Sequence, residues 1–120
     1  MKSLLIISIF CLFATTLLAQ NKSLKAGIFD KNKKIILADA ACGECKLGLK
    51  GKSCDLAVRI NGKAYFVDGV NIDSLGDAHA KDGFCNAVRK VQVQGEIKDD
   101  LFVASYFNLL PTSEKLKRKK

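Results

Sequence analysis

The sequence predicts a small, mainly β domain of the β-rich α+β class, and three observations support this. Short apolar or alternating runs recur between turn residues, as is typical of strands. Asn61-Gly62 stands between two such runs and predicts a tight hairpin, because this pair supplies the positive φ angles of a type I′ turn. Helical spacing occurs in only one short stretch. One sheet or barrel with one short helix is therefore expected.

Each strand is predicted from its own pattern. The first three strands are short apolar runs, the fourth alternates apolar and polar residues, and the fifth is a long apolar run ended by Pro111. Asp99-Asp100 can turn between the last two. The expected strands are Ile35–Ala38, Leu56–Ile60, Lys63–Val67, Val91–Ile97 and Leu101–Leu110.

The expected helix lies between the third and fourth strands. Asp82 can cap a helix from Gly83 to about Lys90, with Phe84 and Val88 on one face. A helix at this place among five strands is the connectivity of the OB-like five-stranded barrel. The alternative is a small open α+β sheet.

The chain is expected to contain one domain, 35–111, with different segments on either side. Residues 1–19 read as a signal peptide, with Lys2 before an apolar run and small Ala19 before the cleavage point. The run is shorter than the roughly 20 residues of a membrane-spanning helix. Residues 20–34 form a polar leader, and 112–120 form a basic disordered tail. Periplasmic or extracellular localisation is expected after cleavage near Ala19.

The net charge is +8, and basic residues of this kind can contact nucleic acid, anionic lipid or an acidic partner. Much of this charge lies in the basic tail, which predicts weak contact with an anionic membrane surface. Nucleic-acid binding is not expected, although OB barrels often bind single strands. Most of the aromatic residues on the strands are expected to fill the core, and export would separate the chain from cellular RNA. These aromatic residues are Tyr65, Phe66, Tyr106 and Phe107.

Four cysteines remain after the signal peptide, at positions 42, 45, 54 and 85. The loop carrying the first three enters the second strand, which runs to the far end of the sheet and turns at Asn61-Gly62. The third strand then returns. The segment with Cys85 must therefore start at the end where the cysteine loop lies. All four thiols are expected to gather at this end.

Three chemistries fit these thiols. The first is two structural disulfides, with Cys85 bridging to the loop, because a bridge between distant segments can contribute about 3 to 4 kcal/mol. The second is a metal site, with zinc as the ion, ligands from Cys42, Cys45, Cys54 and Cys85, and His79 able to replace one cysteine. The third is redox exchange at Cys42-x-x-Cys45, although no helical pattern follows to stabilise a thiolate.

Hydrolytic catalysis is not expected, because no serine stands in a nucleophile-elbow pattern and Cys-His chemistry would need a free thiol in an oxidising compartment. No catalytic residue is expected, and no cofactor is favoured, with zinc as the alternative. The hypothesis is an exported, non-enzymatic binding or structural module, with a cysteine end stabilised by disulfides and an unidentified protein or small ligand as partner. The alternative is a metal-binding or thiol-redox protein.

The stretch from Ala41 to Pro111 resembles a family of small, uncharacterised exported bacterial proteins that is common in Bacteroidetes. The resemblance implies export and draws attention to the cysteines and His79, but it implies no activity. The matching segments are Ala41–Cys45, Gly51–Ala57, Gly62–Val67, Gly76–His79 and Gly83–Ala87.

Overall fold

Residues 24–51 and 53–112 are described by the structure, a computed structural model, and they form six strands and one short helix. The predicted signal peptide, and all of the predicted tail beyond Thr112, lie outside the described residues. The elements are β1 (Lys25–Gly27), β2 (Ile36–Cys42), α1 (Gly43–Lys46), β3 (Leu56–Ile60), β4 (Lys63–Asp68), β5 (Arg89–Lys98) and β6 (Leu101–Leu109).

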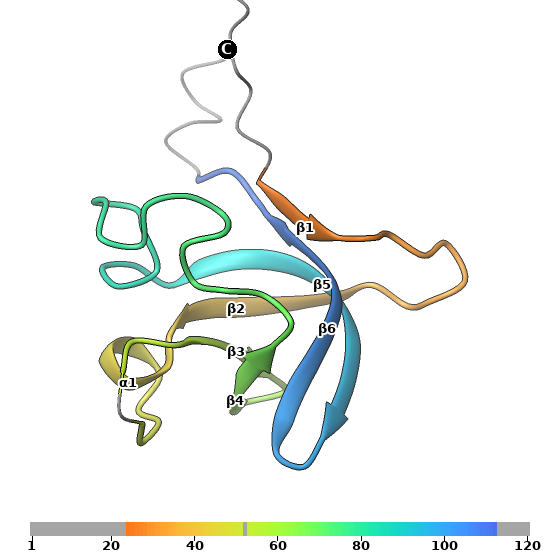
Figure 1. The fold of residues 1–120 in the computed structure, drawn as a ribbon, viewed down its shortest axis with the longest axis horizontal. Coiled ribbons are helices and arrows are strands. Elements are labelled where there is room, and N and C mark those ends of the chain that lie inside the picture. The colour runs from red at the N-terminus through yellow and green to blue at the C-terminus, as the bar shows by residue number, and fades with distance from the viewer. Residues whose placement is uncertain (1–23, 52, 113–120) are drawn as a thin grey trace, which may run out of the picture.

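Five of these strands close a barrel (Figure 1). β2 pairs with β3, β3 with β4, β4 with β6, β6 with β5, and β5 with β2 again, while β1 is added along β6. All pairs are antiparallel except β4 and β6, which run parallel. This is OB-like connectivity, so the predicted fold class is confirmed. The alternative of an open sheet is wrong.

Two hairpins follow from local sequence. Asn61 and Gly62 join β3 to β4 with φ angles of 51° and 83°, as the Asn-Gly pair predicts. Asp99 and Asp100 join β5 to β6 with φ angles of 52° and 61°, which aspartate tolerates better than most residues. Both predicted turns are confirmed, and each strand that flanks them starts or ends within about two residues of its predicted position.

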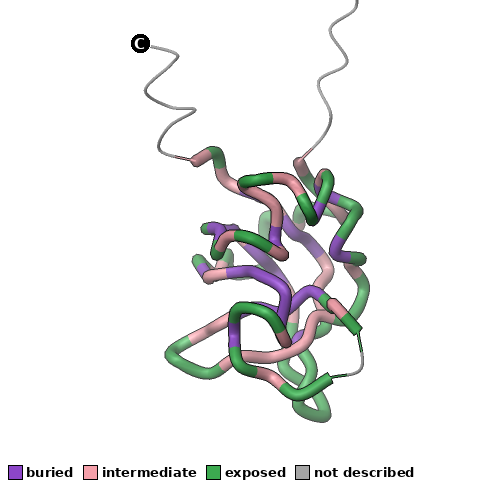
Figure 2. Tube along the Cα trace, turned by 90° about the vertical axis from the view of Figure 1, so that its left-hand side faces the viewer, coloured by how far each residue is buried: buried purple, intermediate pink, exposed green. Residues whose placement is uncertain are grey.

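The core fills the inside of the barrel, where buried positions gather on the strands (Figure 2). Val91 and Val93 on β5 face inward with Phe102 and Phe107 on β6, and all four are at most 1% exposed. Tyr65 on β4 packs against the same cluster. Tyr65 and Phe107 therefore lie in or against the interior, as expected from sequence. Phe66 instead packs against a second, smaller cluster, and Tyr106 contacts the ring of Phe29, so the expectation holds only for part of the strand aromatics.

The segment expected as a polar leader contributes β1, whose three residues pair with β6. The loop after β1 is held by Gln94, which is fully buried on β5 beside a bulge where Ser105 of β6 has no partner in the register. The Gln94 side chain accepts a hydrogen bond from the Asp30 amide at 2.9 Å and donates to the carbonyls of Asp30 and Lys33 at 2.7 and 2.8 Å. These bonds satisfy a polar group that would otherwise be costly to bury.

The helix expected from Gly83 to about Lys90 is wrong. Turns occupy this stretch, and Arg89 and Lys90 already belong to β5. The Ala87 amide makes one helix-like bond to the Gly83 carbonyl at 2.9 Å, but the Cys85 amide donates across the loop to the Ala78 carbonyl, also at 2.9 Å, and no continuous helix forms. The one helix of the described residues is α1, between β2 and β3. No helix in this part of the chain is long and apolar enough to cross a membrane.

Candidate functional site

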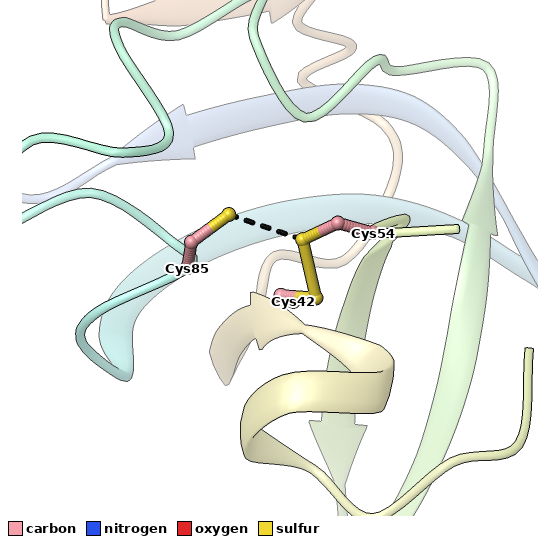
Figure 3. A group of neighbouring side chains, drawn as sticks. All are labelled: Cys42, Cys54 and Cys85. Atoms are coloured by element: carbon pink, nitrogen blue, oxygen red, sulfur yellow. Dashed lines mark hydrogen bonds between the residues drawn. A yellow bond between two sulfur atoms is a disulfide. The ribbon is translucent and has the colours of Figure 1, made fainter.

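Three cysteines from three separate segments meet at one end of the barrel (Figure 3). Cys42 is the last residue of β2, Cys54 lies two residues before β3, and Cys85 lies in the loop that joins β4 to β5. The antiparallel pairing of β2 with β3 places Cys42 opposite Leu56, which brings Cys54 close to Cys42. Sheet register therefore positions the first two sulfur atoms.

The sulfur atoms lie in contact. Cys42 and Cys54 form a disulfide, with their Cα atoms 5.6 Å apart. The Sγ of Cys85 lies 3.0 Å from the Sγ of Cys54. All three sulfur atoms lie within 4.8 Å of one another. Cys42 is fully buried, and the other two are partly buried.

Backbone contacts of the loop place Cys85 in this group. The Cys42 amide donates to the Phe84 carbonyl at 2.9 Å, so the loop is bonded to the end of β2 beside the cysteines. Gly83 allows a close approach, because a Cβ at that position would lie 2.4 Å from the Asp77 carbonyl oxygen. Asn86 closes the turn by donating from its side chain to the carbonyls of His79 and Ala80, both at 2.9 Å.

Glu44 is a site residue that sequence reasoning missed. Its Oε2 lies 3.6 Å from the Sγ of Cys42 and accepts a hydrogen bond from the Asp55 amide at 3.2 Å. This carboxylate therefore connects α1 to the chain next to Cys54. The signal in the sequence is an acidic residue between Cys42 and Cys45, inside the C-x-x-C spacing.

The pKa of the Cys85 thiol is raised above its ordinary value. Burial is the main cause, because it disfavours the charged thiolate, and the charges of Cys45, Asp73 and Asp77 act in the same direction. The protonated thiol is therefore the dominant form of Cys85 at neutral pH.

Cys45 and His79 lie apart from the three sulfur atoms. Cys45 is a free, exposed cysteine on α1. The His79 side chain is 80% exposed, and its Nδ1 lies 4.0 Å from a carboxylate oxygen of Asp77. Among the residues that the structure describes, the group able to hold a metal consists of Cys42, Cys54 and Cys85 alone. The structure thus brings together three of the five residues proposed from sequence.

The disulfide expected between Cys85 and the cysteine loop is not formed in the structure. Cys85 does lie beside the cysteine loop, as the strand directions predict, but it is a free cysteine in the structure. The bonded pair is Cys42–Cys54, across 12 residues. Sequence spacing cannot rank these pairings, because the choice depends on β2–β3 register. A redox pair confined to Cys42 and Cys45 is not formed either.

The model of a family of unknown function (DUF6370) matches residues 36–110, which span the barrel from β2 to the end of β6. No curated protein and no solved structure matches the chain.

Proposed function

Since the chain belongs to this family of unknown function, we propose a function from its geometry: an exported, non-enzymatic binding or structural module, whose cysteine end is stabilised by an exchangeable disulfide. One observation carries the proposal. The Cys54 sulfur is bonded to Cys42 and lies 3.0 Å from the free Cys85 sulfur. A disulfide in contact with a free thiol can exchange its partner without any external reagent.

The exchange is balanced within the chain. The Cys85 thiolate attacks the Cys54 sulfur, a Cys54–Cys85 bond forms, and the Cys42–Cys54 bond breaks. Cys42 leaves as a thiolate and takes up the proton that Cys85 released, so no electrons enter or leave the protein. Glu44 Oε2, 3.6 Å from the Cys42 sulfur, is placed to accept a hydrogen bond from the Cys42 thiol once it is free.

Both isomers would stabilise the fold, but by different loops. In the chain-entropy description, closing the 12-residue Cys42–Cys54 loop contributes about 3 kcal/mol, and the 31-residue Cys54–Cys85 loop contributes somewhat more. Exchange would therefore change the segment that is cross-linked to Cys54, from the end of β2 to the Cys85 loop, without unfolding the barrel. Oxidised cysteines suit an exported chain, and the apolar run at the N-terminus supports export.

A small ligand or a protein is the partner that we propose, at the same end of the barrel. A cavity of about 310 Å³ lies on the Cys85 loop and is lined partly by Asp77, Gly83 and Phe84. This volume is at the lower limit of typical ligand sites, about 300 Å³. Because Phe84 directly precedes Cys85, a ligand in this cavity would contact the segment that the exchange moves.

The exchange can be tested in a Cys45→Ser variant, which keeps only the three sulfur atoms in contact. Trypsin places these cysteines in separate peptides, 35–46, 53–59 and 82–89. The oxidised variant is incubated with a chelator at neutral and alkaline pH, quenched with acid and mapped without reduction. Both a Cys42–Cys54 and a Cys54–Cys85 peptide pair are expected, and higher pH should speed their interconversion, because the thiolate is the attacking form.

A Cys45→Ser, Cys85→Ser double variant is the matched control. It lacks the attacking thiol and should give only the Cys42–Cys54 pair at every pH. If the single variant also gives only this pair after prolonged alkaline incubation, the disulfide does not exchange and the proposal fails.

A further inference from the structure

The three cysteine sulfur atoms converge from three segments, and their spacing is close to that of thiolate ligands around one metal ion. In a tetrahedral zinc–thiolate centre with Zn–S bonds of about 2.3 Å, neighbouring sulfur atoms lie about 3.8 Å apart. The three sulfur atoms here all lie within 4.8 Å of one another. Small changes of side-chain torsion would therefore bring the reduced cysteines to metal–ligand spacing, with the backbone in place.

The number of sulfur atoms also matters. A single disulfide uses two, and the third sulfur, that of Cys85, remains in the group as a free thiol 3.0 Å from the Cys54 sulfur. One metal ion satisfies all three. We propose that the reduced chain binds one thiophilic metal ion of the Zn²⁺ or Cu⁺ class through Cys42, Cys54 and Cys85.

The surroundings hold these ligands in position. Each comes from a different segment, and backbone bonds join the segments: the Cys42 amide to the Phe84 carbonyl and the Gly43 amide to the Asp55 carbonyl, at 2.9 and 2.8 Å. Glu44 adds a third link through the Asp55 amide. Such supporting contacts orient ligands and raise affinity. Soft thiolates favour Zn²⁺ and Cu⁺ over harder ions.

The ligand set excludes two residues that the sequence had suggested. His79 is exposed and lies beside Asp77, and Cys45 is exposed on α1. The fourth position of a tetrahedral ion would be left to solvent or to a partner's donor group. Metal binding needs the disulfide reduced: an external dithiol takes up the Cys42–Cys54 bond as its own disulfide and leaves two thiols. Binding of the ion to the three cysteines then releases their protons.

The test uses the full chain after signal-peptide removal, reduced with a phosphine under anaerobic conditions. Zn²⁺ is titrated in competition with a chromophoric chelator, and Cd²⁺ is followed by thiolate-to-metal charge-transfer absorption. We expect one ion per chain by native mass spectrometry, with a mass that shows three displaced protons. The same chain unfolded in urea is the control for weak metal binding by unorganised thiols. It should give up its metal ion to the chelator.

Variants define the ligands. Cys85→Ser should weaken Zn²⁺ binding at least about 100-fold, beyond the 10- to 100-fold typical of supporting residues. Cys45→Ser and His79→Gln should leave the affinity within about tenfold of the parent chain. A folded reduced chain that binds no tighter than the unfolded one would overturn the site, and so would equal losses in Cys45→Ser and Cys85→Ser. The exchange experiment contains a chelator, so either proposal can fail while the other stands.

Discussion

Replacing Phe107 by alanine is expected to lower the free energy of unfolding by about 3 to 5 kcal/mol. Phe107 is fully buried on β6, at a position paired with both Val93 of β5 and Ala26 of β1. Removing its ring leaves a cavity in the barrel interior as well as losing buried apolar surface. A domain of this size has a free energy of unfolding of only about 5 to 15 kcal/mol, so this substitution would remove a large share of its stability.

Urea unfolding of the oxidised protein measures this effect, and Phe29→Ala is a matched control. Phe29 is 50% exposed and makes an edge contact with Tyr106, at 5.3 Å between ring centroids. Its loss should cost no more than about 1.5 kcal/mol. Equal destabilisation by the two substitutions would show that the interior has been assigned to the wrong face of β6.

The second large effect is expected for Cys54→Ser. Cys54 contributes the sulfur that touches both other cysteines, so this change removes the Cys42–Cys54 disulfide and the Cys85 contact together. Loss of the disulfide should lower the free energy of unfolding by about 2 to 4 kcal/mol. Exchange should stop, and metal binding by the reduced chain should weaken as in Cys85→Ser.

The Cys85→Ser variant distinguishes the Cys42–Cys54 disulfide of the structure from the Cys85 disulfide expected from sequence. It leaves the Cys42–Cys54 disulfide intact, so the oxidised variant should lose less than about 1 kcal/mol. A loss as large as that of Cys54→Ser, measured by urea unfolding without reductant, would instead show that Cys85 carries the main structural disulfide.

Local sequence was enough to predict most of the barrel. The two hairpins depend on Asn61-Gly62 and Asp99-Asp100, and their strands depend on apolar patterns within a few residues. The end of the barrel at which Cys85 lies also followed from strand directions alone. β1 was missed because its three residues, Lys25–Gly27, carry no pattern, and its pairing with β6 is set by tertiary contacts.

The failed predictions share one physical cause, competition from contacts that are distant in sequence. Residues around Phe84 have helical spacing, but the Phe84 carbonyl bonds to the Cys42 amide, and Asn86 uses its side chain to hold the turn. The disulfide partner of Cys54 depends on β2–β3 register, which no cysteine spacing encodes. Glu44 has its role only once α1 has folded against the chain at Asp55.

The central claim is that Cys54 lies between Cys42 and Cys85 in one sulfur cluster, and a peptide map of the protein purified without reductant tests it most directly. Trypsin leaves Cys42 and Cys45 in one peptide, and a second cut after Glu44 separates them. The account predicts that the Cys54 peptide is joined to the Cys42 peptide, with a fraction joined to the Cys85 peptide. A Cys54 peptide joined mainly to the Cys45 peptide would contradict it.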